Sequence, residues 1–381
     1  MTKKLSIVTI ILLMLYAMIP NVEEKKEDKY VKKEVRGVFI SYIELQTYIK
    51  DKSYNESISN IENIVKNLKQ NNFNTIYLQV RSHMDSIYNS DLFPVSKNII
   101  LENKESYDVL KEFIEISKKE NIDIYAWVNP YRIGTSYNKD SKYYTRVKDD
   151  IKNVNGVYYL NPASNNSREL IIDGVKEIVK KYDVKGILFD DYFYPSKEID
   201  LEDYNKENKN ISIEEYRLNN INTMIKSVNK EIKSINRNIE FGISPDANID
   251  NDYNKEYADV KRWGNDNEYV DFLMPQIYYG FENESKPFAE VLEEWRKVVT
   301  NDKVKLLVAL AFYKTGKIDN YAKKGQNEWI DNTDIIKREV LKIREKENIE
   351  GFSMFRYDNI FNSSIMTENS KKEKQNLNEI M

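Results

Sequence analysis

Short apolar runs recur along the chain, and each pair of runs is separated by a longer segment of mixed polarity. Near-continuous apolar runs of this kind are typical of parallel strands that are buried on both faces. Eight of them are found, at residues 37–41, 75–80, 122–129, 186–191, 240–245, 272–277, 305–312 and 351–355. The pattern therefore predicts eight strands that alternate with other elements.

Several of the intervening segments carry apolar residues at every third or fourth position, which is typical of a helix with one buried face. The stripes are Ile58, Ile61, Val65 and Leu68; Leu170, Val175, Ile178 and Val179; Leu218, Ile221, Ile225, Val228, Ile232 and Ile235; and Ile335, Val340 and Ile343. Eight strand–helix units over roughly 320 residues predict an α/β fold, a single (β/α)8 TIM barrel with extended βα loops. A doubly wound sheet is the alternative, but it would show fewer strands and a glycine-rich first turn.

The two ends of the chain differ from this pattern. Residues 1–20 begin with Lys3 and Lys4 and continue as an apolar run from Leu5 to Ile19, which predicts a signal peptide or an N-terminal membrane anchor. We therefore expect an extracytoplasmic protein that contacts the membrane only through this segment. Residues 21–34 are predicted to be a charged linker, residues 35–361 the barrel, and residues 362–381 a disordered charged tail.

Composition excludes several classes of function. The net charge is −4 with acids and bases finely mixed, so no basic surface is expected to hold nucleic acid. The chain has no cysteine and one histidine, which argues against zinc, iron–sulfur and thiol chemistry. Phosphate-binding glycine motifs are absent, and we expect no cofactor. Asp246, Asn248, Asp250 and Asp252 alternate like the start of a calcium loop but lack its glycine and glutamate, so we assign no metal.

The run at 186–191 ends in two adjacent carboxylates, Asp190 and Asp191. Carboxylates are disfavoured on buried strands unless they are paired or functional. Parallel α/β barrels place their active sites at the C-terminal ends of the strands. Because successive strand residues face opposite ways, only one of the two is expected to face such a site. The alternative is that the pair caps the next helix or satisfies amides in the loop.

Nearly every other predicted strand also ends in polar or aromatic residues: Tyr42, Glu44, Arg81, His83, Asp85, Tyr88, Asn129, Tyr131, Arg132, Tyr192, Asp246, Gln276, Tyr278, Tyr279, Tyr313, Lys314, Arg356, Tyr357 and Asp358. Aromatic faces and hydrogen-bonding groups together suit carbohydrate. Trp127 is either a platform for a sugar ring or part of the core.

Hydrolysis of a glycosidic bond usually needs two carboxyl groups, one of which is protonated. Asp190 or Asp191 is the best candidate for one of them, since repulsion between neighbouring carboxylates raises one pKa. Asp246 is the first choice for the partner, followed by Asp85, Glu44 and Asp358.

Seven segments, in order across about residues 35–357, resemble the glycosyl hydrolase-like 10 family: RGVFIS at 36–41, NTIYLQVR at 74–81, AWVNPYR at 126–132, YLNP at 159–162, GILFDDYFYP at 186–195, FGISP at 241–245 and MPQIY at 274–278. The resemblance implies an exported bacterial TIM barrel, related to chitinase-like and poly-glucosamine hydrolases, that acts on cell-wall or exopolysaccharide glycans. It also implies that the site is lined by Arg81, Asp85, Asn129, Tyr131, Arg132, Asp190, Asp191, Gln276 and Tyr278.

The sequence departs from the family at two places. His83 and Met84 stand where relatives have small residues, and Asp246 stands where they often have an aromatic residue or glycine. The terminal acid of the similar chitinase-type motif is replaced by Tyr192 or Phe193. A mechanism assisted by an N-acetyl group of the substrate would then take its acid from Asp190 or Asp191.

Two hypotheses follow from the sequence. The first is an exported glycoside hydrolase that cleaves a bacterial polysaccharide or peptidoglycan glycan. The second is a catalytically silent barrel that binds glycan at the cell surface. A second carboxylate roughly 5–10 Å from the first separates them, because only the hydrolase needs it. A metal-dependent carbohydrate deacetylase fits a single histidine poorly.

Overall fold

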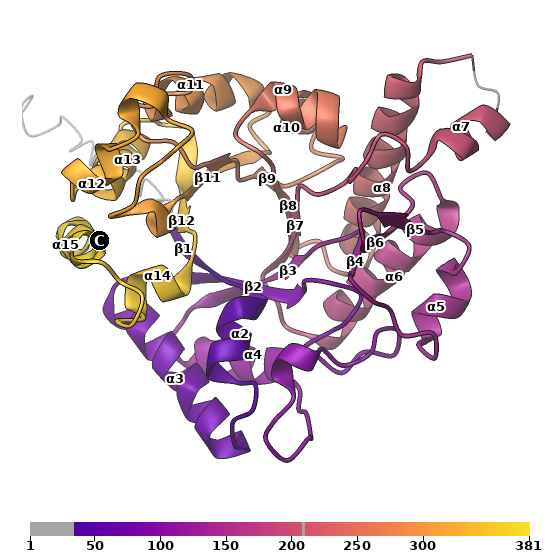
Figure 1. Ribbon diagram of the computed structural model, residues 1–381, viewed down its shortest axis with the longest axis horizontal. Coiled ribbons are helices and arrows are strands. Elements are labelled where there is room, and N and C mark those ends of the chain that lie inside the picture. The colour runs from indigo at the N-terminus through magenta and orange to yellow at the C-terminus, as the bar shows by residue number, and fades with distance from the viewer. Residues whose placement is uncertain (1–33, 208–209) are drawn as a thin grey trace, which may run out of the picture. The chain divides into compact units, whose positions relative to one another are not determined.

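A ring of parallel strands forms the centre of the protein (Figure 1). The computed structural model describes residues 34–207 and 210–381. The strands are β1 (Val35–Ile40), β2 (Thr75–Arg81), β3 (Asp123–Val128), β7 (Gly186–Asp190), β8 (Glu240–Ser244), β9 (Phe272–Leu273), β10 (Gln276–Ile277), β11 (Lys305–Leu310) and β12 (Ile349–Met354).

The ring closes because the first and last strands pair. β1 lies between β12 and β2, and the parallel order continues through β3, β7, β8, β9, β11 and back to β12. β9 and β10 are two parts of one strand, and Pro275, which lacks an N–H, stands between them. Counted this way, eight strands form the barrel, and the predicted TIM-barrel fold is confirmed.

Helices surround the ring, as Figure 1 shows. Their bounds are α2 (Tyr42–Tyr48), α3 (Tyr54–Gln70), α4 (Val109–Lys119), α5 (Lys142–Val147), α6 (Asn165–Lys181), α7 (Leu201–Glu207), α8 (Ile213–Ile235), α9 (Ile249–Asn251), α10 (Val260–Asn265), α11 (Phe288–Val298), α12 (Glu328–Asp331), α13 (Ile335–Arg344), α14 (Tyr357–Phe361) and α15 (Glu368–Asn378). The four predicted apolar stripes lie on α3, α6, α8 and α13. Serines begin several helices by accepting a backbone N–H, as Ser53 does for α3.

The loop between β3 and α6 carries α5 and a small antiparallel sheet of β4 (Arg132–Gly134), β5 (Ile151–Val154) and β6 (Val157–Leu160). Short single turns of helix lie at Lys97–Ile99, Asp252–Glu256, Phe312–Lys314 and Lys323–Gly325, in the loops that follow β2, β8 and β11. These insertions are the extended βα loops that the chain length predicts.

The inside of the ring is filled with large side chains rather than open. The interior cluster consists of Phe39, Tyr77, Tyr125, Trp127, Leu188, Phe272, Met274, Leu307 and Ala309. Glycine stands where these rings need room: a Cβ on Gly242 would lie 2.2 Å from the ring of Phe272. A second, larger apolar cluster lies between the strands and the helices.

The C-terminal segment corrects the expectation of a disordered tail at 362–381. Residues Glu368–Asn378 form α15, which packs against α13 and α14. The buried Glu373 carboxylate accepts hydrogen bonds from the N–H groups of Ile335 and Lys337, at 3.0 and 3.2 Å. Leu377 is also buried. The helix is held largely by polar contacts at the start of α13, which an apolar pattern does not indicate.

The predicted signal or anchor at residues 1–20 lies outside the described residues, as does all of the predicted linker except its last residue, Glu34. Within the described part of the chain, no helix combines the length and the apolar character needed to cross a membrane.

Candidate active site

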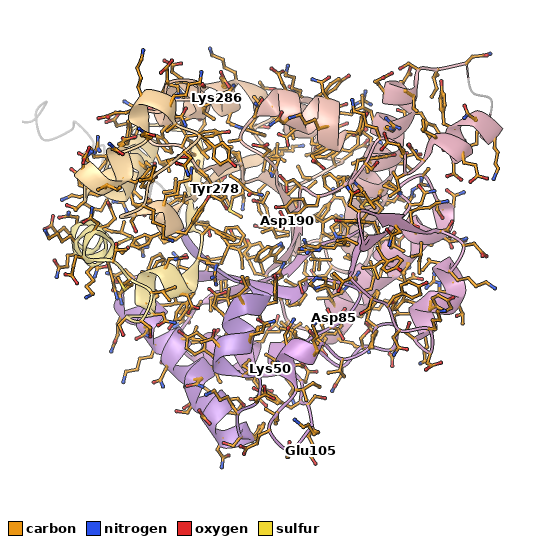
Figure 2. All side chains as sticks on the ribbon, in the orientation of Figure 1. Lys50, Asp85, Glu105, Asp190, Tyr278 and Lys286 are labelled. Atoms are coloured by element: carbon orange, nitrogen blue, oxygen red, sulfur yellow. The ribbon has the colours of Figure 1, made fainter. Side chains whose placement is uncertain are left out.

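A cavity of about 160 Å³ opens at the C-terminal ends of the strands. Its walls come from β1, β2, β3, β7, β8, β10 and β12 and the loops that follow them. The lining residues are Phe39, Ser41, Tyr42, Ile43, Gln79, Trp127, Asn129, Arg132, Asp190, Tyr192, Ser244, Gln276, Tyr278 and Phe355. Asp190 is the one acidic residue in this set and Arg132 the one basic residue. Figure 2 places Asp190 and Tyr278 within the ring of strands.

Aromatic rings form the floor and one wall of the cavity. The ring of Phe39 meets Trp127 edge-on at 5.3 Å between centroids and lies 5.6 Å from Phe355. Tyr278 lies 5.8 Å from Phe355. Because these rings belong to the interior cluster or pack against it, the floor is continuous with the core of the barrel.

Amide side chains fix the polar groups of the cavity. Gln276 donates from Nε2 to the Ser244 carbonyl at 3.0 Å and to Oδ1 of Asp190 at 3.4 Å. Gln79 donates from Nε2 to Oδ1 of Asn129 at 2.9 Å and accepts the N–H of Tyr42 at 3.1 Å. Fixed partners of this kind hold hydrogen-bonding groups in place before a ligand arrives.

The Asp190–Asp191 pair is divided between two sides of the ring. Leu188 belongs to the interior cluster and Phe189 to the outer one, so alternation turns Asp190 inward, where it lines the cavity. Asp191, which is also buried, does not line the cavity. One of its carboxyl oxygens, Oδ1, has no hydrogen-bond partner.

The pKa values of the two carboxyl groups are raised to different extents. Burial raises the pKa of Asp191 well above its usual range, and the negative charge of Asp190 adds to this effect. Burial also raises the pKa of Asp190, but hydrogen bonds from Asp191, Trp127 and Gln276 oppose that rise. Asp191 therefore keeps its proton to higher pH than Asp190, and its backbone N–H donates to Oδ1 of Asp190 at 3.1 Å.

Further acids lie behind this pair, in the loop after β8. Asp252 is fully buried and accepts the N–H of Asp246 at 3.1 Å. Asp246 itself accepts hydrogen bonds from the N–H of Asn248 at 3.0 Å and from Asn251 at 3.2 Å. Asp246, the expected second carboxylate, thus binds its own loop and is not among the lining residues. Burial raises the pKa of Glu256 to about 7.

Three further predicted site residues, like Asp191 and Asp246, lie outside the cavity lining. A register shift in β2 between Gln79 and Arg81 turns Arg81 toward the helices, where its guanidinium lies 3.8 Å above the ring of Phe93. Tyr131 is fully buried against Phe193. Asp85 lies in the loop after β2, away from the ring (Figure 2), and burial raises the pKa of its carboxyl group.

Glu44 and Asp358, the remaining candidates for the second carboxylate, make contacts within the barrel. Glu44 caps the start of α2 through Ser41, accepts the N–H of Asp358 at 3.2 Å and pairs with Arg356. Asp358 accepts the hydroxyl of Tyr48 at 2.8 Å. Neither carboxylate lines the cavity.

His83 lies beside the site without lining it. Its ring meets Tyr42, a lining residue, at 5.7 Å, and its Nδ1 lies 2.8 Å from the Ser82 hydroxyl. Burial and the nearby charge of Arg132 lower the pKa of His83 to about 4, so the imidazole is neutral at ordinary pH.

Of the predicted site residues, Asn129, Arg132, Asp190, Tyr192, Gln276 and Tyr278 do come together around the cavity. Gln79, Ser244 and Phe355 were missed. Gln79 could have been found, because it follows the inward-facing Tyr77 by two positions on the same strand.

A closed barrel of eight parallel strands, with an aromatic and amide-lined cavity at their C-terminal ends, defines the TIM-barrel class of protein. Within that class, residues 34–331 match the model of the family described as glycosyl hydrolase-like 10. The chain belongs to this family, as the resemblance of its motifs predicted.

Relatives from two bacteria support the assignment. The chain is 26% identical over 322 residues to the glycosyl hydrolase YngK of Bacillus subtilis (strain 168), covering 77% of this chain and 61% of YngK. It is 27% identical over 327 residues to the glycosyl hydrolase DigH of Escherichia coli (strain K12), covering 76% of this chain and 73% of DigH.

Solved structures share the fold. The glycoside hydrolase domain of PgaB (BpsB) from Bordetella bronchiseptica aligns with a TM-score of 0.60 at 12% identity, covering 91% of this chain and 99% of that domain. A GH20 exo β-N-acetylglucosaminidase from Vibrio harveyi aligns with a TM-score of 0.55 at 8% identity, covering 91% of this chain and 54% of the enzyme.

Proposed function

We propose that the protein is an exported glycoside hydrolase that cleaves a bacterial cell-wall or exopolysaccharide glycan built from N-acetylated amino sugars. Membership of the glycosyl hydrolase-like family supports hydrolysis of glycosides. The charged and apolar pattern of residues 1–20 supports export, by secretion or by anchoring at the cell surface.

The observation that carries the proposal is the position of Asp190. It is the one acid among the lining residues that the structure describes, and we infer that the pair shares a proton that Asp191, with the more strongly raised pKa, carries. In the proposed reaction this shared proton moves through Asp190 to the oxygen of the leaving sugar as the C1–O bond breaks. General acid catalysis of this kind contributes about 10²- to 10⁴-fold in rate.

The nucleophile comes from the substrate in this proposal. No second carboxyl group is found among the lining residues that the structure describes. Some glycosidases without one use the 2-acetamido oxygen of the sugar, which attacks C1 and forms a cyclic intermediate. Water then opens the intermediate and returns its proton to Asp190. This requirement for an internal nucleophile is why we infer an N-acetylated amino sugar.

The other lining groups would orient the sugar ring. Trp127 and Tyr278 offer aromatic faces, and Asn129 and Gln276 offer amide groups that are already fixed. Arg132 is positioned for an anionic or hydroxyl group. The negative charge of Asp190 and burial raise the pKa of the Tyr192 hydroxyl, so that it remains a hydrogen-bond donor.

The test is release of reducing ends from purified bacterial wall glycan and from poly-N-acetylglucosamine. We expect the wild-type protein to release them and Asp190→Asn to lose at least about 10²-fold in kcat, because the acid is gone. Circular dichroism checks that the variant folds. Asp191→Asn should retain part of the activity, since it does not contact the sugar. Full activity of Asp190→Asn would contradict the assignment.

A catalytically silent glycan-binding barrel is the second candidate. The absence of a second carboxylate among the described lining residues favours it. It predicts that the protein binds the same glycans without releasing any product. Asp190→Asn would then alter glycan binding only, because there is no hydrolysis to slow.

A further inference from the structure

The cavity is too small to hold more than a short piece of a glycan. Its volume of about 160 Å³ lies well below the roughly 300–1,000 Å³ of sites that enclose a drug-sized ligand. If a polymer places one sugar ring beside Asp190, the neighbouring rings must lie over the rim of the barrel. The rim residues therefore decide whether a long chain is held.

The loop after β11, residues 311–327, presents an unusually exposed aromatic residue on this rim. The Tyr321 side chain is 88% exposed, and Ile318 in the same loop is 55% exposed. Among the large apolar side chains that the structure describes, Tyr321 is the most exposed. The exposed tyrosine that lines the cavity, Tyr192, is 55% exposed.

A partly buried ion pair ties this loop to the cavity wall. Lys314 donates from Nζ to the carbonyl of Tyr278 at 2.7 Å and to the Asp319 carboxylate at 2.6 Å. The other oxygen of Asp319 accepts the N–H of Tyr321 at 3.2 Å. Two side chains thus connect the backbone of Tyr321 to Tyr278, whose ring lines the cavity and stands 5.7 Å from that of Tyr313.

The loop is fixed from its other side as well. The hydroxyl of Thr315 lies 2.8 Å from that of Ser370 on α15, and Asp319 donates its N–H to the carbonyl of Gln326 at 2.9 Å. A tyrosine ring on a fixed backbone loses little conformational freedom when a ligand stacks on it. These contacts fix the backbone of a residue whose aromatic side chain is almost fully exposed to water.

We propose that Tyr321 is an outlying subsite, on which a sugar ring of the same glycan chain stacks while another ring occupies the cavity. The ligand class is a polymeric or oligomeric glycan, and the site favours internal positions of a long chain over its end. This inference rests on the proposed function in one respect, that the cavity binds a glycan.

The test measures binding without turnover. Asp190→Asn is used as the parent, and its migration in native gels that contain glycol chitin or peptide-free wall glycan strands gives a dissociation constant. We expect Tyr321→Ala to weaken binding about 5- to 10-fold, a change of about 1–1.4 kcal/mol. Tyr321→Trp should restore it. Tyr54→Ala, which removes an exposed tyrosine from the outer helix α3, should leave it unchanged.

Chain length provides a second readout in the active protein. Tyr321→Ala should lower kcat/KM on the polymers and leave hydrolysis of an aryl N-acetylglucosaminide, which fills only the cavity, unchanged. Equal binding by the parent and Tyr321→Ala would overturn the subsite while leaving the proposed function standing. Failure of both the parent and the wild-type protein to bind either glycan would overturn both.

Discussion

Asp190 and Asp191 show how two neighbouring side chains of the same type acquire different properties. Asp190 has access to the cavity, whereas Asp191 holds the proton and is packed behind it. Asp191 keeps that proton because burial and the charges of Asp190, Asp252 and Glu256 all disfavour its ionised form. Burial raises the pKa of Glu256 itself, and the nearby charge of Lys255 opposes that rise.

This division predicts the pH dependence of the rate. A group whose pKa is raised holds its proton to higher pH than usual, so the proposed general acid should remain effective at neutral pH and fail on the alkaline side. In Asp191→Asn the neighbouring proton donor is replaced by a neutral amide. We expect the alkaline limb of the kcat profile to move to lower pH, while KM changes little.

Glu256→Gln is the companion variant for that profile, because it removes one of the negative charges that raise the pKa of Asp191. It should move the alkaline limb in the same direction by a smaller amount. An alkaline limb that stays in place in both variants would show that the Asp190–Asp191 pair does not supply the reacting proton.

Among the helices, the contact of α13 with α15 includes two buried acids whose pKa values are raised. Glu339 on α13 is fully buried, and neither of its carboxyl oxygens has a partner. Burial raises its pKa well above the usual range, and the charges of Glu373 and Glu328 add to this. Burial likewise raises the pKa of Glu373 on α15 to about 7.

Stability should therefore fall with rising pH. Because these pKa values are raised in the folded state, the stabilisation is complete below about pH 4.5, the usual value for glutamate, and is lost as the pH rises through the folded values, about 7 for Glu373. Glu339→Gln cannot ionise and should make the free energy of unfolding less dependent on pH. Urea unfolding at about pH 5 and about pH 9 measures this.

The exposed Glu347, which follows α13 in the chain, gives the control. Glu347→Gln should leave the difference between the two pH values unchanged. If Glu339→Gln shows the same loss of stability at alkaline pH as the wild-type protein, then Glu339 does not ionise in that range.

For the barrel as a whole, the aromatic filling of its interior limits which residues the strands can carry. A Cβ at Gly242 would meet three atoms of the Phe272 ring at 2.2–2.4 Å. That ring is enclosed, with Tyr125 packed against it edge-on at 5.6 Å, and has little room to move. At this point of the interior, the aromatic ring fits only because the residue facing it is a glycine.

We expect Gly242→Ala to lower the free energy of unfolding by about 2–3 kcal/mol, the cost of overpacking a filled interior. Gly156→Ala is the control: Gly156 has a φ of +85° but open space around it, so only the backbone cost of about 1 kcal/mol applies. Urea unfolding of both variants measures the difference. Equal losses would mean that the ring of Phe272 adapts.

The sequence predicts the barrel well because each parallel strand is a buried apolar run and several of the helices have a clear period. It predicts the site less well, since apolar runs do not show which of two neighbours faces inward. Leu188 and Phe189 are equally apolar, so Asp190 and Asp191 cannot be told apart from the pattern. The register shift in β2, which turns Arg81 outward, has no signal in residue type.

Arg344 joins the two ends of the described barrel. Its guanidinium binds the carboxylate of Glu34 at 2.7 and 2.8 Å and the carbonyl of Ile380 at 2.6 Å. Because β1 and β12 are also neighbours in the ring, the chain could begin at another strand and still form the same closed ring. A circularly permuted chain, with these ends linked and the exposed turn at Gly156 opened, would keep every strand pair of the barrel.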